Sequence, residues 1–296
     1  MSKVALVYGK NRAKNIKNSL HLIEDEIKEN LKDKNNLLLK PNIVNINSEA
    51  GTTNKETLAA ILEFLRSFYK GKIILGEGAG VGDTFEAFRR LGYLDLQKPY
   101  DLELVDLNKT ESTLISVYGP DLKKNFPQHI SNIVLDADYI ISVALLKTHD
   151  SVVATFGLKN LIVGSFQEKC QFGMDKTFHQ GYPAMNRTLA ELAGKINPDL
   201  TILDGMQAMG GNGPSHGDLV RMNIAIASTD WLAADILAMN LMGFKLEEIG
   251  YLFLSAKKVL GESDPEKMNI VGEKNWKKFI KKIKPHPNYP EHIKWR

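Results

Sequence analysis

The sequence predicts an α/β fold whose sheet is largely parallel or mixed, with helices on both faces. Early in the chain, short aliphatic runs typical of buried strands alternate with stretches in which apolar residues recur every three or four positions, as in amphipathic helices. Glycine, proline or asparagine follows many of the aliphatic runs. This alternation is typical of βαβ units, whose consecutive strands pair in parallel.

The first elements follow this rhythm. The segment Lys3–Gly9 is rich in Val, Ala and Leu and is predicted to be a buried strand, and the apolar spacing over Ile16–Leu31 predicts an amphipathic helix. A second strand, Asn36–Pro41, ends at its proline, which cannot donate to a central ladder. Thr53 followed by Glu56 forms a capping box, so a helix is expected to begin there.

Three further strands are expected in this first part. Lys72–Leu75 leads into the glycine-rich segment Gly76–Gly82 and a short helix, Thr84–Leu91. Leu102–Leu107 and Ser112–Tyr118 are predicted to be the next two strands.

The remainder of the chain is less regular. Gly119–Ser131 contains two prolines and is expected to be a long connection, whereas Tyr139–Leu146 has the apolar character of a buried strand. Ser165–Pro183 has no clear periodicity and is predicted to be a functional or mobile loop. Leu200–Leu203 is expected to be a strand, followed over Asp204–Pro214 by a loop that resembles a ligand-covering loop or, alternatively, is a plain long turn. The other predicted elements are a strand at Met222–Ala227, helices at Asn186–Ile196, Trp231–Met242 and Leu246–Leu260, and a last strand at Met268–Val271.

Composition predicts a soluble globular protein. The 296 residues are 43% hydrophobic and 25% charged, and no internal repeat or low-complexity linker is visible. Residues 1–273 are expected to form a single large α/β domain, or alternatively two α/β halves near 1–118 and 119–273. Residues 274–296 are expected to be a basic C-terminal extension. Its lysines either lie on a solvated face or form a surface that binds an anionic partner.

Several classes of function are disfavoured. The net charge of +3 and the absence of an aromatic–basic ladder argue against nucleic acid binding. The single cysteine, Cys170, excludes a disulfide framework, a self-contained iron–sulfur cluster and a Cys-rich zinc site. No secretory signal and no apolar run long enough to span a bilayer are visible, so a cytoplasmic protein without membrane contact is expected.

The strongest functional signal follows the apolar strand Tyr139–Leu146. Lys147 and His149 come directly after it, and Lys159 lies in an otherwise uncharged run. Ligands of open α/β sheets bind beyond the carboxyl ends of the strands. An imidazole titrates near neutrality, and a lysine near other cations can have a lowered pKa, so His149 and Lys159 are the predicted catalytic pair. The alternative is that His149 caps a helix and Lys159 is solvent-exposed.

Other strand ends supply the predicted binding residues. The segment Gly76–Gly82 lies between a strand and a helix, the place for binding a phosphate or carboxylate, but its spacing matches neither a dinucleotide nor a P-loop motif. The full predicted binding set is Lys40, Asn42, Thr52, Thr53, Gly76, Glu77, Gly78, Gly80, Lys147, Thr148, Asn160, Asp204, Gly211, Asn212 and Gly213. His149, His179 and His216 are weak metal candidates without diagnostic spacing, so metal and cofactor stay open.

Six motifs, in order, resemble a known family. They are LLLKPN, GTTNKETLAAIL, GEGAG, ISVALLKTH, GLKNLIVG and DGMQAMGGNGP, followed by the segment Asp230–Gly243. In content and order they are similar to domain of unknown function 362 (DUF362) over Leu37–Gly243. Many members of that family are linked to iron–sulfur proteins, some through fused ferredoxin modules. Since this chain has no such module, the resemblance implies that any cluster comes from a partner.

A fainter resemblance is to the nickel-dependent lactate racemase family. In that family a histidine shortly before a glycine-flanked lysine belongs to the site that exchanges a hydride with a nucleotide-derived nickel cofactor. Only His149 and Lys159 match this pattern, and Lys40 to Asn42 stands where the family has an arginine-bearing motif. This likeness bears on where the site lies and leaves the reaction open.

Two hypotheses about function follow. The first is an enzyme of unassigned reaction acting on an anionic small molecule, a carboxylate or a phosphate, at the carboxyl edge of the sheet. Lys40, Lys147 and Lys159 would hold the anion, and His149 would act as acid or base. The alternative is a non-catalytic partner of an iron–sulfur or redox system that docks a ferredoxin-like protein through the C-terminal lysines.

Overall fold

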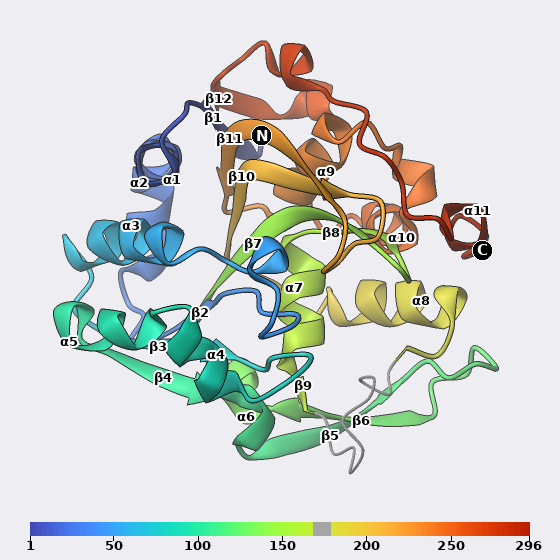
Figure 1. Ribbon diagram of the computed structural model, residues 1–296, viewed down its shortest axis with the longest axis horizontal. Helices are drawn as coiled ribbons and strands as arrows, with labels where there is room; N and C mark the ends of the chain where they lie inside the picture. Colours follow the sequence, from blue (N-terminus) through green and yellow to red (C-terminus); the bar gives the residue numbers. More distant parts are fainter. Residues whose placement is uncertain (168–178) are drawn as a thin grey trace.

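A central mixed sheet organises the molecule (Figure 1). The computed structural model describes residues 1–167 and 179–296. The strand order is β12-β1-β11-β10-β7-β2-β3-β4, and β8 pairs with β7. Its strands are β1 (Lys3–Tyr8), β2 (Asn36–Lys40), β3 (Lys72–Glu77), β4 (Leu102–Asp106), β7 (Tyr139–His149), β8 (Val153–Thr155), β10 (Leu200–Gly210), β11 (Asp218–Ser228) and β12 (Asn269–Gly272). From β10 to β4 the neighbouring strands run parallel, so the predicted fold class is confirmed.

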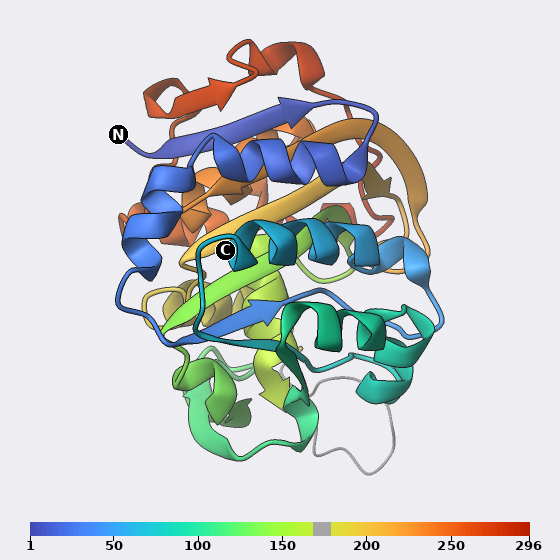
Figure 2. The same cartoon turned by 90° about the vertical axis from the view of Figure 1, so that its left-hand side faces the viewer.

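Helices cover both faces of this sheet (Figures 1 and 2). One core joins the sheet to α1 (Arg12–His21), α2 (Glu24–Leu31), α3 (Lys55–Arg66), α4 (Thr84–Arg90) and α5 (Gln97–Tyr100). The other core joins it to α6 (Asn132–Leu135), α7 (Gly157–Ser165), α8 (Tyr182–Leu192), α9 (Trp231–Leu241) and α10 (Gly250–Lys257). The sheet is therefore a middle layer, which explains why its strands read as unbroken apolar runs.

Strand geometry divides the apolar residues between the two cores. Side chains of a strand alternate between faces, so Leu37 and Leu39 enter the core beneath α3, whereas Leu38 enters the core beneath α7. In β7, Ile141 and Ala144 separate in the same way, and every position from Tyr139 to His149 is buried. Because both faces are covered, the sequence of β7 carries no apolar–polar alternation.

A second, small antiparallel sheet lies at the lower edge of the molecule in Figure 1. It consists of β5 (Ser112–Val117), β6 (Phe126–Ser131) and β9 (Phe166–Gln167). The prediction that Gly119–Ser131 is only a connection was therefore wrong. β6 contains Pro127 and polar residues, and its backbone pairing with β5 has no counterpart in the apolar pattern. The predicted loop Ser165–Pro183 lies partly outside the described residues, including Cys170.

The predicted loop after Leu203 is instead a long β-hairpin. β10 continues to Gly210, pairs with β11 and carries a bulge between Gly205 and Gln207. The tip of the hairpin begins at Gly211, whose φ of +70° suits a residue without a side chain. Glycines and methionines obscure the strand pattern in this stretch, so the sequence alone suggested a loop.

Two helix predictions need correction. The expected helix Ile16–Leu31 is two helices, because the chain turns between His21 and Glu24. The cap of α3 is Asn54, whose side chain accepts the N–H of Glu56, and not Thr53. The hydroxyl of Thr53 donates to the carbonyl of Val143 and accepts the N–H of Asn42, so it joins two elements. Asp230 caps α9 by accepting the N–H of Ala233 at 3.0 Å.

The C-terminal segment 280–296 packs on the body of the molecule and includes α11 (Tyr289–His292). The N–H groups of Lys281 and Ile283 donate to the carbonyls that end α9 and follow it, at 2.9 and 3.0 Å. His292 and Trp295 are buried, and Ile283 joins the core beneath α7. The segment therefore contributes structure of its own despite its basic composition.

Candidate functional site

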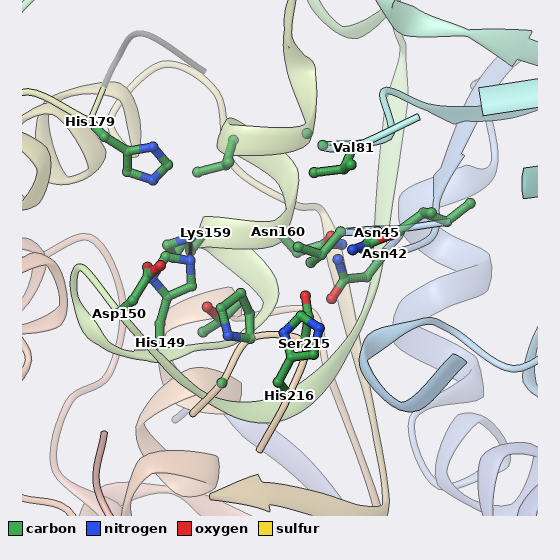
Figure 3. A pocket seen from close by; sticks show the side chains of 18 of the residues that line it. Asn42, Asn45, Val81, His149, Asp150, Lys159, Asn160, His179, Ser215 and His216 are labelled. Carbon is green, nitrogen blue, oxygen red and sulfur yellow. Dashed lines mark hydrogen bonds and ion pairs between the residues drawn. The ribbon is translucent and has the colours of Figure 1, made fainter. Parts of the chain in front are cut away.

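A cavity of about 570 Å³ opens at the carboxyl ends of the parallel strands β2, β3 and β7. The segments that follow these strands form its walls, together with one side of α7 and the tip of the β10–β11 hairpin. In Figure 3, His149, Asp150 and Lys159 lie together on one side, while Asn42 and Asn45 lie across from them. The volume falls within the range of small-molecule sites.

His149 and Lys159 are in direct contact. The Nζ of Lys159 lies 2.8 Å from the Nε2 of His149, and both side chains are buried. His149 ends β7 and Lys159 lies in the first turn of α7, so a strand end and a helix start meet at the cavity. The alternative interpretation, an exposed lysine and a helix-capping histidine, does not fit these positions.

The other nitrogen of His149 has two neighbours. The carboxylate of Asp150 lies 2.9 Å from Nδ1, and the backbone N–H of Ser151 lies 3.0 Å from it. When Lys159 is an ammonium group it can only donate, so Nε2 accepts and Nδ1 carries the proton toward Asp150. When Lys159 is a neutral amine, Nε2–H can donate to it and Nδ1 can accept from Ser151. Both tautomers of His149 thus have partners.

The electrostatic environment keeps His149 neutral. Burial, followed by the nearby Lys159 charge, lowers the pKa of His149 to about 3, even though Asp150 favours protonation. Burial raises the pKa of Asp150, but its bonds with His149 and Ser151 together outweigh this and hold that pKa below its ordinary value. Near neutral pH the site therefore presents a neutral imidazole between a carboxylate and a lysine.

A distant carboxylate fixes the start of α7. Asp235 on α9 accepts the N–H groups of Gly157 and Leu158, at 2.9 and 3.1 Å, and is completely buried. Burial raises the pKa of Asp235 to about 7, while the two backbone donors oppose that rise. This clamp sets the direction in which Lys159 and the neighbouring Asn160 leave the helix.

Lys40 lies behind the wall of the cavity. Its Nζ forms a 2.6 Å ion pair with Glu77, and both side chains are almost fully buried. Burial lowers the pKa of Lys40, and the Glu77 charge opposes that shift. A Cβ at Gly164 would meet both groups more closely than real Cβ atoms approach, so only glycine lets α7 pass over this pair.

Lys147 is also buried, and it faces the loop after β2. Its Nζ donates to the side-chain oxygen of Asn42 and, at 2.8 Å, to the carbonyl of Gly51. Burial, followed by the charge of Lys159, lowers the pKa of Lys147 to about 7. Lys147 therefore holds the loop that carries Asn42 and is not itself part of the cavity wall.

The predicted site residues thus fall into two groups. Those in the cavity wall are Asn42, Glu77, Gly78, Gly80, His149, Lys159, Asn160, His179, Asn212, Gly213 and His216. Those outside the wall are Lys40, Thr52, Thr53, Gly76, Lys147, Thr148, Asp204 and Gly211. Thr148 fastens β7 to the hairpin by donating to Gly211, whereas Asp204 pairs with Arg12 at 2.9 Å and lines a separate hollow with Thr52.

The weak metal candidates are not gathered into a site in the described ranges. The rings of His149 and His179 stack with centroids 6.2 Å apart, and His216 lies on the hairpin tip. Within residues 1–167 and 179–296, no three His, Cys, Asp or Glu side chains converge as metal ligands would. Which cofactor, if any, enters the cavity stays open.

Sequence reasoning missed several wall residues. Asn45, Asp150, Ser215 and His286 line the cavity but were not predicted to do so. Asp150 directly follows His149, which was the available signal. His286 comes from the C-terminal segment, and only the fold brings it to the cavity.

In the part of the chain that the structure describes, no helix has the length and apolar character needed to span a bilayer.

Known proteins resemble this chain in sequence and fold. A thylakoid-associated protein of Synechocystis sp. is 29% identical over 208 residues, which are 70% of this chain and 62% of that protein. The chain thus spans less than two thirds of that curated relative. The lactate racemase apoprotein from Thermoanaerobacterium thermosaccharolyticum has a TM-score of 0.52 at 14% identity, covering 82% of this chain and 57% of that one. A protein from Thermotoga maritima has a TM-score of 0.48 at 15% identity, covering 85% and 60%.

At such low identity, the likeness to the lactate racemase apoprotein shows a shared fold. The family is shown by sequence, because residues 37–240 match the model described as Domain of unknown function (DUF362). That range includes both members of the His149–Lys159 pair and most of the cavity wall. The chain therefore belongs to the DUF362 family.

Proposed function

We propose that this protein is an enzyme that binds an anionic small molecule, a carboxylate or a phosphate, in the central cavity. The observation that carries the proposal is the buried contact of 2.8 Å between Lys159 and His149 in the cavity wall. A lysine and an imidazole in contact supply a cation for the anion and a group that accepts or donates a proton.

The surrounding charge supports an anionic ligand. Lys40 and Lys147 are buried close to the wall, and Lys147 donates only to neutral oxygens in the described part of the chain. Glu77 partly compensates these cations through its pair with Lys40. The amide groups of Asn42 and Asn160 can donate further hydrogen bonds to an oxyanion.

The environment of His149 supports proton transfer. Lys159 passes a proton to or from the bound molecule and stays hydrogen-bonded to His149, because Nε2 can accept an N–H from the ammonium form and from the amine form. Asp150, next to Nδ1, keeps the proton of the neutral imidazole on that nitrogen. The resulting reaction class is general acid–base chemistry on a bound acid, such as exchange of a proton next to a carboxylate.

Hydrogen exchange with the solvent tests this proposal and does not require the product to be identified. The protein would be incubated in D₂O with a panel of 2-hydroxy, 2-oxo and dicarboxylic acids, and deuterium incorporation would be followed by NMR. We expect exchange into one class of acid, with a loss of about a hundredfold or more in Lys159→Met and His149→Gln. Lys267→Met, which changes an exposed lysine, is the control.

Two outcomes would speak against the enzyme. One is exchange that persists unchanged in both site variants. The other is a lack of both exchange and binding for every acid and for inorganic phosphate, measured by calorimetry. In that case the pair would serve only to position α7 against β7.

The alternative proposal is a non-catalytic partner that docks a ferredoxin-like protein. Lys282 and Lys284 are exposed in the C-terminal segment, and Lys284 lies near the hairpin tip, whereas Lys277 and Lys278 pair with nearby glutamates. Salt-sensitive binding of a purified ferredoxin, lost in Lys282→Glu and Lys284→Glu, would favour this role. The buried contact of His149 and Lys159 in the cavity wall favours the enzyme.

We also propose a cytoplasmic location without membrane contact. The described helices offer no bilayer-spanning segment, but the Synechocystis relative is described as thylakoid-associated. Cell fractionation with washes of increasing salt tests this proposal, since a protein held at a membrane surface by charge would be released by salt.

A further inference from the structure

The C-terminal segment contributes an imidazole to the cavity. His286 is part of the wall, although it lies beyond the stretch that matches the family model, which ends at residue 240. The segment is fastened beside the cavity, because the N–H of Gly211 donates to the carbonyl of Lys284 at 2.7 Å. Gly211 precedes Asn212 and Gly213, which line the same cavity. The bond between Gly211 and Lys284 therefore joins the two segments that carry His286 and the hairpin tip into one side of the cavity.

Local bonding makes His286 a hydrogen-bond donor. The backbone N–H of Asn288 donates to Nδ1 of His286 at 3.1 Å. With Nδ1 engaged as an acceptor, the neutral ring carries its proton on Nε2. A donor of this kind suits an oxygen of a carboxylate or phosphate.

His292 lies behind His286. Their rings stack with centroids 5.4 Å apart, and the ring of Tyr182 packs edge-on against His292 at 4.9 Å. His292 is completely buried, and the backbone of Asp150 lies beside its ring. His292 acts on the wall through the stacking of its ring on that of His286.

The size of the cavity indicates a ligand that reaches this wall. A volume of about 570 Å³ lies in the middle of the range of roughly 300–1,000 Å³ found for sites that bind drug-sized molecules. An acid as small as acetate, held at Lys159, would leave most of that space to solvent. A larger ligand with a second acidic or polar group would fill it and meet His286.

We propose that His286 is a ligand-binding residue for the distal group of an extended polyanion, such as a tricarboxylate, and that His292 positions it. This inference rests on the proposed function, since the proximal carboxylate is held at Lys159. It makes the C-terminal segment a determinant of ligand size in this chain.

Histidine side-chain NMR with two acids tests the inference. Protein labelled at the imidazoles would be titrated with acetate and with citrate, and the rings assigned by His149→Gln and His286→Gln. We expect acetate to shift the signal of His149 alone and citrate to shift those of both His149 and His286. His286→Gln should weaken citrate about tenfold and acetate less than twofold, whereas His21→Gln, an exposed control, should change neither.

Variants of His292 test the positioning role. His292→Phe keeps a flat ring, so we expect citrate affinity within twofold of the unaltered protein, whereas His292→Ala should weaken citrate several-fold. Equal losses in the two variants would overturn the positioning role. If citrate shifts His149 but not His286, the inference fails and the proposed function stands. If neither acid shifts His149, the inference fails, and the titration is repeated with inorganic phosphate and the acid panel; no shift of His149 by any of them would overturn the proposed function as well.

Discussion

At the scale of single residues, the position of a lysine at a strand end does not decide its role. Lys40 and Lys147 both end or nearly end parallel strands, as the sequence predicted, yet neither lines the cavity. Lys40 is on the same face as Leu38 and meets Glu77, whereas Lys147 meets Asn42 and a backbone carbonyl. Because β7 is buried on both faces, its sequence gives no alternation from which the face of Lys147 could be predicted.

The buried Lys147 should give the protein a characteristic dependence of stability on pH. Its pKa is about 7 in the folded protein against an ordinary value of 10.5, so between these values the unfolded chain binds more protons. The free energy of unfolding, relative to Lys147→Met, should therefore rise with pH over this range, by at most ~1.4 kcal/mol per pH unit. Urea denaturation at a series of pH values measures the difference.

Lys72→Met supplies the matched control, since Lys72 is an exposed lysine on β3 of the same sheet. Its difference from the unaltered protein should stay flat with pH in the same range. A flat difference for Lys147→Met as well would mean that Lys147 keeps an ordinary proton affinity inside the protein.

At the scale of elements, α7 shows what local sequence cannot reveal. The residue before it, Phe156, offers no side-chain cap, so no start signal is visible in the sequence. Asp235, 78 positions away, caps Gly157 and accepts from Leu158 as well. The predicted pair of His149 and Lys159 was recognisable from its motifs, but the contact between them depends on this long-range clamp.

Asp235→Asn should loosen the start of α7 and change the pH dependence of folding. The asparagine has one oxygen for two N–H donors, so the amides of Gly157 and Leu158 should exchange faster with deuterium. The pKa of Asp235 is about 7 when folded and 3.8 ordinarily, so the folded chain binds more protons between these values. Relative to Asp235→Asn, the free energy of unfolding should fall as pH rises from about 4 to 7.

Hydrogen exchange resolved by mass spectrometry and urea denaturation would provide the two measurements. Asp25→Asn, on an exposed stretch of α2, is the matched control and should change neither. Unchanged protection at the start of α7 in Asp235→Asn would mean that packing alone holds the helix.

At the scale of the whole molecule, the sequence predicted the βαβ rhythm well and the assembly of the site only in part. The strands β2, β3 and β7 were recognisable because each is an aliphatic run with a polar exit. The hairpin tip and His286 reach the cavity only through pairing and packing over long sequence separations. Whether residues 1–273 form one domain or two halves stays a prediction. The strands β2 and β7, which lie on opposite sides of the expected boundary near residue 118, pair with each other.

The C-terminal segment should be part of the cooperative fold, and Trp295 is the residue that tests this. Trp295 is 4% exposed, its ring lies 5.5 Å from that of Phe253, and its indole N–H donates to the carbonyl of Glu247 at 3.2 Å. Trp295→Ala removes this packing and should lower the free energy of unfolding by about 3–5 kcal/mol. The amides of Lys281 and Ile283, which bond to the body, should then exchange faster.

The control for this prediction is Lys294→Ala, since Lys294 is exposed and pairs only within its own turn. It should leave the free energy of unfolding within about 0.5 kcal/mol of the original value. If Trp295→Ala behaved like this control, the segment would be a loosely attached tail. A large loss confined to the tryptophan variant would instead show that the cavity and the C-terminal segment fold as one unit, as the position of His286 in the wall requires.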